Sequence, residues 1–309
     1  MRQFISTLWH SPPAIKAALI TALTSLVVSV LTAFAALANT PIKLWVEKIS
    51  QRSRLQIDYE SSTRYKLRDL LGRYRGLLLE AAESFNHRSW NLYGNETKGW
   101  LDMNGSYSNE VDYYFHSWVG RLVKLMATAN AFEDEAIFID PKIADKADFE
   151  FIYTVKSWSL LICDAQLFKG LSYDSENPTD HLFKDSLKSL CSELWIDGKL
   201  CSGKAISKIM KTEHGLHIYR LLDGLCSTEV RLRWDRFVCL HLLVMLFLNE
   251  YGYSFHRSTP EQFREVIDKL RHPEIALNFR HSLQRLHLTN TTTGKLISKL
   301  LADRAGVKQ

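Results

Sequence analysis

One glycine-rich segment has the spacing of a phosphate-binding loop. Gly198 and the pair Gly203-Lys204 follow the G-x-x-x-x-G-K pattern that cradles nucleotide phosphates. The next residue should be a Ser or Thr that holds Mg²⁺, but it is Ala205. The pattern also requires a preceding strand, whereas residues 187–195 have the periodicity of an amphipathic helix. Nucleotide binding is therefore not expected here.

Two histidines, His214 and His217, lie one helical turn apart beside Glu213. Zinc sites need further ligands at defined spacings. The nearest cysteines, Cys201 and Cys226, form no Cys-x-x-Cys pair. The sequence therefore predicts no metal site, and no other motif implies a cofactor.

A group of acidic residues and a histidine surrounds one predicted turn. Asp174, Asp180 and His181 lie close in sequence, and Asp164 precedes them by a few helical turns. Such a group is suited to general acid–base catalysis. The structural alternative is favoured, in which Asp180 caps the following helix and Asp174 closes a turn. No catalytic residue is predicted.

Three further polar features have simpler structural interpretations. Glu133-Asp134-Glu135, with Asp140, would attract a cation, but a solvated acidic loop is expected. His241 lies within an apolar run and is predicted to be a hydrogen-bonded core histidine with a lowered pKa. The basic stretch 64–75 is one helix wide and partly balanced by Asp69, so nucleic acid is an unlikely partner.

The elements that must position these side chains are helices. Between residues 65 and 85, apolar side chains recur at the i, i+3, i+4 spacing of an amphipathic helix. Gly72 and Gly76 within it suggest close approach of a second helix. The run 237–248 is too short to cross a bilayer and is predicted to be the central buried helix. Further helices are predicted over 110–132, 148–169, 179–195, 204–212, 215–224, 229–251, from 260 to before 272, 274–288 and 294–305.

Residues 17–38 differ from everything that follows them, because they contain no charge, proline or glycine. As a helix this stretch would be roughly 33 Å long, enough to cross a hydrocarbon core of about 30 Å. The prediction is an all-α protein with a single N-terminal transmembrane helix. A cleaved signal peptide is the rival interpretation, since Ala36-Leu37-Ala38 has the small-x-small form of a cleavage site. The apolar region is longer than the usual ~7–15 residues of a signal peptide.

The flanks of this stretch suit a membrane interface. Trp9 and Trp45 stand on either side, where an indole favours the headgroup layer. The whole net charge of +5 is accounted for by residues 43–75, and the basic side chains nearest the span are expected to contact anionic headgroups. These are Lys43, Lys48, Arg52 and Arg54.

The positive-inside rule places the large C-terminal part in the cytoplasm of the cell. The predicted organisation is a non-cytoplasmic tail over 1–16, a transmembrane helix over 17–38, a basic juxtamembrane helix over 39–60 and a helical cytoplasmic domain over 61–309. The odd count of 5 cysteines agrees with reduced thiols rather than a disulfide framework.

One face of the predicted span carries only small side chains. They recur every four residues, at Ala17, Thr21, Ser25, Ser29 and Ala33. We call these five residues the small-residue ridge. Such a ridge lets two transmembrane helices approach closely. It predicts self-association in the membrane.

These features favour a membrane-anchored helical protein that acts by binding an unknown protein partner and by forming a homo-oligomer, without catalysis. Two alternatives remain open. One is a membrane-perturbing effector of a bacterial defence or toxin system, whose cytoplasmic domain senses a signal. The other is an enzyme with a helical active site that no sequence motif identifies. The sequence carries no motif that points to a known family.

Overall fold

The computed structural model describes residues 12–107, 112–176, 179–196, 198–201 and 203–306, with backbone only at 38–42 and 203–204. The fold is all-α, as predicted, with 76% helix and 1% strand. The chain divides into two units, residues 1–62 and 63–309. One helix, α2 (Pro13–Asn95), has residues in both units.

In the first unit, α2 begins at Pro13, so residues 13–16 of the predicted tail are helical. A proline suits the first helical position because its missing N–H has no intrahelical partner there. The helix continues through position 41, although a proline there removes one backbone hydrogen bond. The predicted boundaries of tail, span and juxtamembrane helix stay predictions.

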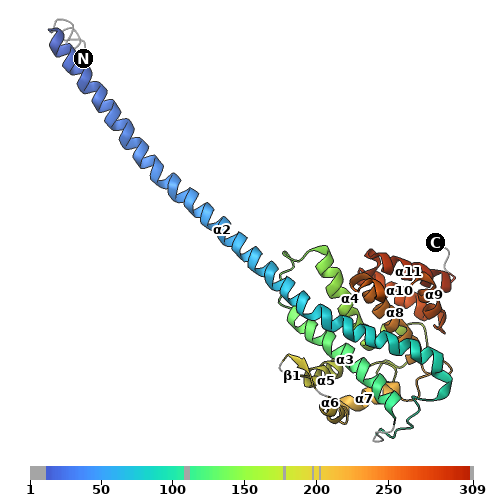
Figure 1. The fold of residues 1–309 in the computed structure, drawn as a ribbon. Coiled ribbons are helices and arrows are strands. Elements are labelled where there is room, and N and C mark those ends of the chain that lie inside the picture. Colours follow the sequence, from blue (N-terminus) through green and yellow to red (C-terminus); the bar gives the residue numbers. More distant parts are fainter. Residues whose placement is uncertain (1–11, 108–111, 177–178, 197, 202, 307–309) are drawn as a thin grey trace. The chain divides into compact units, whose positions relative to one another are not determined.

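The second unit contains the C-terminal part of α2 and a series of shorter helices joined by turns and loops (Figure 1). The described elements that follow α2 are η1 (Glu96–Lys98), α3 (Tyr113–Ala136), α4 (Lys146–Cys163), η2 (Ala165–Phe168), α5 (Lys184–Leu194), β1 (Trp195–Ile196), β2 (Lys199–Leu200), α6 (Gly203–Ile209), α7 (Glu213–Leu222), α8 (Arg233–Tyr251), η3 (Ser254–His256), α9 (Pro260–Asp268), α10 (Pro273–Arg285), η4 (Leu288–Asn290) and α11 (Thr292–Arg304).

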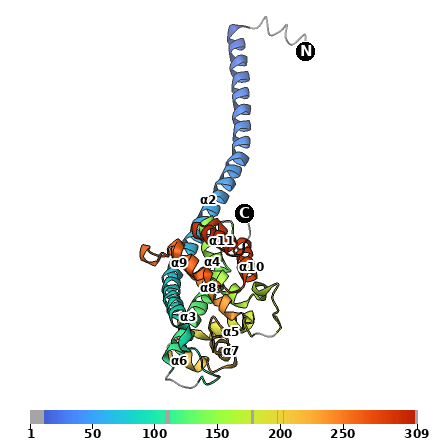
Figure 2. The same cartoon turned by 90° about the vertical axis from the view of Figure 1, so that its right-hand side faces the viewer.

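Helix α8 is the centre of this unit, as the apolar run at 237–248 predicted. Every residue from Arg233 to Leu248 is buried. Helices α9, α10 and α11 lie on one side of α8 and helices α5, α6 and α7 on the other, in both views (Figures 1 and 2). Phe85 of α2 meets Trp118 of α3 edge to face at 5.3 Å, and Trp118 meets Phe237 of α8 at 5.2 Å. Aromatic packing therefore connects α2, α3 and α8 in one core.

Two helices start at capping boxes, in which the cap and the third helical residue exchange hydrogen bonds. Asp145 and Asp148 form one at α4, and Thr259 and Gln262 form one at α9. The second confirms the helix start predicted at Pro260, which is the first residue of α9. Local polar residues thus determine where these helices begin.

Two predicted helix boundaries and the predicted role of two glycines were wrong. The helix predicted over 179–195 begins only at Lys184 and ends at Leu194, because Trp195 enters a two-stranded antiparallel hairpin. The helix predicted over 148–169 ends at Cys163, and Asp164 accepts a hydrogen bond from Gln166 N to start η2. An added Cβ at Gly72 or Gly76 would meet nothing within 4 Å, so neither glycine marks a close helix contact.

Candidate membrane anchor and polar sites of the body

The N-terminal part of α2 is the one described helix that is long and apolar enough to cross a membrane. This stretch runs over Pro13–Leu37, 25 residues with a mean hydropathy of 2.1, and 0% of it is buried in the protein. Leu26 is 66% exposed and Phe34 is 71% exposed. Helix α8 is also apolar, but its side chains lie in the protein core. Other parts of the protein therefore cover the side chains of α8, but they do not cover those of the apolar stretch of α2.

The hydroxyls of the small-residue ridge are bonded within their own helix. Thr21 donates to the carbonyl of Ala17 at 2.8 Å, Ser25 to Ala22 at 3.0 Å and Ser29 to Ser25 at 2.8 Å. Such back-bonding satisfies a hydroxyl that faces hydrocarbon. Close packing of the small side chains, rather than hydroxyl bonds across a contact, is then what the ridge offers a second helix.

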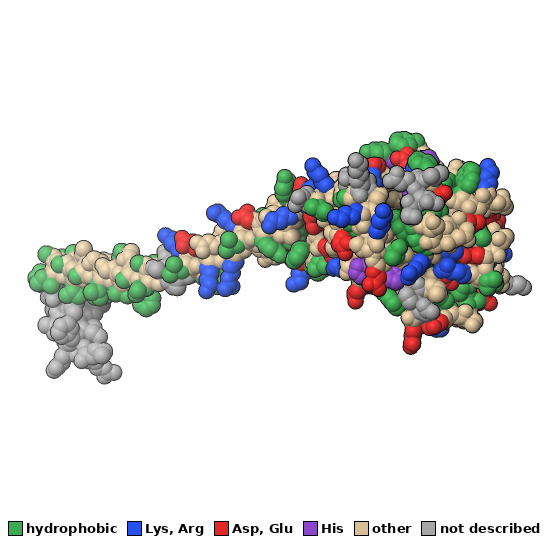
Figure 3. Space-filling view, turned by 90° about the horizontal axis from the view of Figure 1, so that it is seen from below, with side chains coloured by type: hydrophobic (Ala, Val, Ile, Leu, Met, Phe, Trp, Pro, Cys, Tyr) green, Lys and Arg blue, Asp and Glu red, His purple; other side chains and the backbone are tan. Residues whose placement is uncertain are grey.

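The basic residues that follow the apolar stretch all lie on the surface of α2, and Figure 3 shows Lys and Arg side chains along this part of the helix. Lys43, Lys48, Arg52 and Arg54 are exposed, and Trp45 is 66% exposed. The other predicted interfacial residue, Trp9, lies outside the described residues. The exposed charges are available to lipid headgroups, a contact that stays a prediction.

The segment with phosphate-loop spacing forms a different structure. Trp195 pairs with Leu200 and Ile196 with Lys199 in the antiparallel hairpin. Gly198 lies in the hairpin turn with a φ of +73°, a conformation that suits glycine. A phosphate loop instead connects a buried strand of a parallel sheet to a helix. Gly198 therefore lies in an antiparallel hairpin and not after a buried parallel strand.

The histidine pair lies at the start of α7, where Glu213 is the first helical residue. Within the described ranges, no group of three or more His, Cys, Asp or Glu side chains is arranged to hold a metal ion. His214 and His217 are therefore two imidazoles on one turn of α7.

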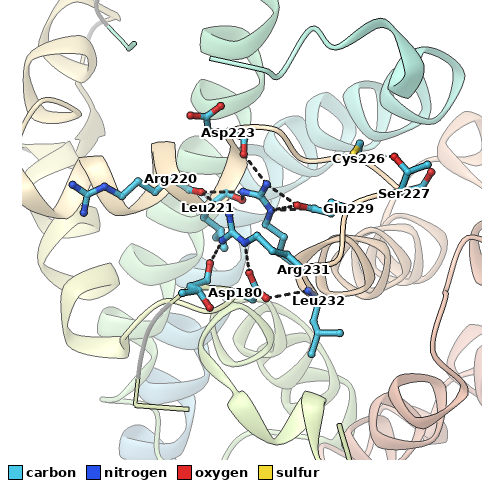
Figure 4. Close-up of polar contacts among 12 residues, drawn as sticks. Asp180, Arg220, Leu221, Asp223, Cys226, Ser227, Glu229, Arg231 and Leu232 are labelled. Atoms are coloured by element: carbon cyan, nitrogen blue, oxygen red, sulfur yellow. Dashed lines mark hydrogen bonds and ion pairs between the residues drawn. The ribbon is translucent and has the colours of Figure 1, made fainter. Parts of the chain in front are cut away.

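Asp180 does not cap α5, contrary to the prediction. Its buried carboxylate accepts from Arg231 Nε at 2.7 Å and from the backbone N–H of Leu232 at 3.0 Å (Figure 4). Leu232 is the N-cap residue of α8, so Asp180 stabilises the start of that helix instead. Asp174 accepts from Glu176 N at 2.9 Å and closes a turn, as predicted.

Arg233 ties the end of α7 to the start of α8. Its guanidinium donates to the carbonyls of Arg220 and Leu221 at 2.9 and 3.0 Å and to that of Asp223, and it pairs with Glu229. The last carbonyls of a helix have no intrahelical donor, so an arginine there satisfies several at once. Sequence reasoning missed this role. The signal was the cluster of charged residues directly before the apolar run.

Arg236 is buried, and among the described residues its guanidinium forms hydrogen bonds with backbone carbonyls rather than with a carboxylate. It donates to the carbonyl of Asp180 at 2.6 Å, to those of Leu161 and Asp164, and lies 4.4 Å from the ring of Phe168. Burial lowers its pKa to about 10. Two of the aspartates considered for acid–base chemistry, Asp164 and Asp180, thus contact Arg236, and both do so through their backbone carbonyls. The arrangement joins helix ends rather than activating a carboxylate.

His181 hydrogen bonds through Nδ1 with the hydroxyl of Tyr173. Both rings are near Arg236, and burial lowers the pKa of His181 while that of Tyr173 is raised. Neutral His181 is therefore favoured in this site. These contacts are consistent with the structural interpretation of the 164–181 group.

The acidic run 133–135 is not a solvated loop, because it forms the last turn of α3. Glu135 accepts from Tyr74 Oη at 2.6 Å and from Arg73 at 2.9 Å, so part of the basic stretch 64–75 is also engaged within the protein. Glu133 accepts from Ser159 Oγ at 2.7 Å, and its burial raises its pKa. Asp140 accepts from Lys142 N at 2.9 Å in the following turn. Glu133 and Glu135 are thus bound by tertiary contacts, whereas this contact of Asp140 is local.

A pocket of about 240 Å³ lies beside Glu133, between residues of α3, α4 and α5. Its lining combines apolar and charged side chains: Met126, Asn130, Glu133, Asp134, Ala136, Ile137, Ile152, Lys156, Ser159, Lys184, Leu187, Lys188 and Cys191. No residue of this lining was predicted to form a binding site. The helix periodicity of α5 is the signal that places Lys184, Leu187, Lys188 and Cys191 on one face.

His241 is a buried, hydrogen-bonded core histidine, as predicted. Nε2 lies 2.8 Å from Asn86 Oδ1, which is an acceptor, so Nε2 carries the proton. Nδ1 then accepts from the hydroxyl of Tyr93 at 3.1 Å. Burial lowers the pKa of His241 to about 3. The imidazole is therefore neutral at physiological pH.

No protein-family model, curated protein sequence or solved structure matches this chain.

Proposed function

We propose that this chain is a single-pass membrane protein that acts by binding a partner and by oligomerising, with its helical body, residues 63–309, on the cytoplasmic side. The observation that carries the proposal is that none of the apolar stretch Pro13–Leu37 is buried in the protein. Burying a large apolar side chain is worth about 1.5–3 kcal/mol, so a stretch of this kind strongly favours a nonaqueous environment. Lipid supplies one without further protein contacts.

Charge asymmetry supports a cytoplasmic body. Before the span, the positive charges are Arg2 and Lys16, while Lys43, Lys48, Arg52 and Arg54 follow it closely. Basic residues next to a span are retained on the cytoplasmic side. The small-residue ridge supports self-association, because small side chains let two helices pack closely in lipid.

Alkaline extraction of membranes tests the anchor. The full chain is expected to stay in the membrane pellet, and replacing Val27 and Leu31 by Lys should release it, since a central lysine costs roughly 2.5–3.5 kcal/mol in a span. The matched control replaces Ile137 and Phe138, which are 71% and 87% exposed in the body, by Lys. Equal extraction of all three proteins would contradict the anchor.

The mass of the extracted chain tests the signal-peptide rival. An intact anchor predicts a membrane-bound protein that retains residues 1–38, whereas cleavage after Ala38 would remove them all. Protease added to sealed cells tests the orientation, because a cytoplasmic body is protected until the membrane is opened. Digestion of the body in sealed cells would reverse the proposed topology.

Self-association is tested by counting subunits in liposomes. Replacing Ser25 and Ser29 by Leu fills the ridge and should shift the protein towards monomer. The matched control changes Leu23 to Phe and Val27 to Leu, on the opposite face of the helix. Unchanged subunit number in the ridge variant would remove the ridge from the proposal.

A further inference from the structure

The pocket between α3, α4 and α5 has an apolar lining large enough for part of a small molecule. Met126 and Leu187 are buried, and Ile152 is half-buried. Ligand pockets in proteins combine such apolar surface with a few convergent polar groups. The volume of about 240 Å³ is below the usual range of roughly 300–1,000 Å³, so an occupant must be small.

The charges of this lining do not balance one another. Lys188 of α5 pairs with Asp134 of α3 at 2.8 Å. Lys156 of α4 and Lys184 of α5 also line the pocket, and neither is ion-paired with any described carboxylate. Two ammonium groups on neighbouring helices therefore face the pocket without a direct counter-charge.

The one remaining carboxyl of the lining, Glu133, is engaged on the protein side. It is held by the hydroxyl of Ser159 at 2.7 Å, and burial raises its pKa, so its negative charge is the disfavoured form relative to water. Lys156 and Lys184 lower the same pKa from a distance but form no ion pair with it. An anion in the pocket would add the direct partner that these lysines lack.

We propose that this pocket binds a small organic anion. Its apolar body lies against Met126, Ile152 and Leu187, and its carboxylate is held between the ammonium groups of Lys156 and Lys184. Attraction between two ammonium groups and one carboxylate gives the affinity its charge dependence. The apolar lining excludes inorganic anions as the preferred occupants, because they bury no hydrocarbon.

Calorimetric titration of the full chain in lipid nanodiscs, corrected with empty nanodiscs, tests the pocket. The probes are 3-phenylpropanoate, the neutral 3-phenylpropan-1-ol and inorganic phosphate. The carboxylate is expected to bind at least about tenfold more tightly than either other probe, since only it combines charge with an apolar body. Equal affinity for the alcohol, or for phosphate, would overturn the proposal.

Charge reversal tests the two lysines. Lys156 and Lys184 are exposed, so the double variant Lys156→Glu, Lys184→Glu should fold and lose about tenfold or more in affinity for 3-phenylpropanoate. The matched control is Lys208→Glu, Lys211→Glu, which changes the net charge equally at exposed positions outside the pocket. Equal weakening in both variants would assign the effect to net charge and overturn the site.

Glu133→Gln gives a test of opposite sign. The amide keeps an acceptor for Ser159 and removes a negative charge, so binding of 3-phenylpropanoate should tighten severalfold. Unchanged or weaker carboxylate binding in this variant would contradict the charge argument and overturn the proposed anion site. Circular dichroism of each variant verifies the fold.

Discussion

At the residue scale, the body depends on a few buried charges that hold helix ends. Asp235 in α8 has no exposed surface. It accepts from the backbone N–H of Arg271 at 2.6 Å, from Arg271 Nε at 3.0 Å and from His272 Nδ1 at 3.1 Å. Neutralising the Asp235 carboxylate would weaken all three of these contacts at once. A buried charge without its partner costs far more than an exposed pair contributes.

Replacing Asp235 by Asn is therefore expected to lower the free energy of unfolding by about 3 kcal/mol. The matched control is Asp69→Asn, which breaks an exposed pair with Arg73 and should cost under about 1 kcal/mol. Denaturant unfolding in micelles, followed by circular dichroism, measures both. Similar small losses for the two variants would show that the Asp235 contacts contribute little.

His241 makes the stability of the body sensitive to acid. Burial lowers its pKa from the ordinary 6.5 to about 3. Between these pH values the unfolded chain binds a proton that the folded chain excludes. Stability is therefore expected to fall as the pH drops below about 6.5, by up to roughly 1.4 kcal/mol per pH unit from this group.

Unfolding free energies measured between pH 7 and about pH 5 test this slope. His241→Gln removes the titrating group and should flatten the profile, while His87→Gln, at an exposed position, should not. The same slope in all three proteins would contradict the assignment. Should His241→Gln fold poorly, the pH dependence of the imidazole NMR resonances of the unmodified protein tests the assignment instead. The resonances of His241 should still be those of a neutral ring below pH 5.

At the element scale, replacing a helical glycine by alanine is expected to raise stability at two positions and to lower it at a third. Gly72 and Gly76 in α2 have open space where a Cβ would stand. Gly294 in α11 lies against η4, and an added Cβ would be 1.9 Å from the carbonyl oxygen of Leu288. Helix propensity alone therefore determines how an alanine at Gly72 or Gly76 changes stability, whereas a clash with the backbone determines the effect at Gly294.

Gly72→Ala and Gly76→Ala are each expected to raise the free energy of unfolding by up to about 1 kcal/mol. Gly294→Ala should lower it by about 1–3 kcal/mol, since η4 or α11 must shift. Thermal unfolding of the three variants in one buffer ranks them. Destabilisation by the α2 substitutions would indicate a packing partner for that face of the helix.

At the scale of the whole molecule, the hydrophobic core lies entirely in the second unit. Among the described residues, every buried apolar side chain is at Leu67 or beyond. The first unit contributes exposed apolar residues and exposed charges to the chain. The body should therefore hold its own fold, and the first unit should determine where the protein resides.

A chain of residues 63–309 is expected to be soluble, helical and cooperative in unfolding. Size-exclusion chromatography and calorimetry measure these properties, with the full chain in nanodiscs as the reference. Aggregation of the shortened chain, or loss of a cooperative transition, would show that residues before Thr63 stabilise the body.

Much of the helical architecture could be predicted from the sequence. The apolar periodicity over 65–85, the run at 237–248 and the start at Thr259-Pro260 depend on residues within a turn or two of each other, and the structure agrees with all three. The start of α5 could not be predicted in this way. Asp180 resembles a local cap, but its carboxylate is bound by Arg231 and Leu232, about fifty residues away.

Most of the polar contacts could not be predicted from the sequence for the same reason, because their partners lie far apart in the chain. The sequence by itself determined which stretches are helical, which apolar stretch suits a membrane and that His241 lies in a core. Only the tertiary structure decided that Asp180 binds Arg231 at the start of α8, and that Lys156 and Lys184 share a pocket with Glu133. Periodicity follows from neighbours along the chain, whereas burial and the pairing of charges depend on which distant helices pack together.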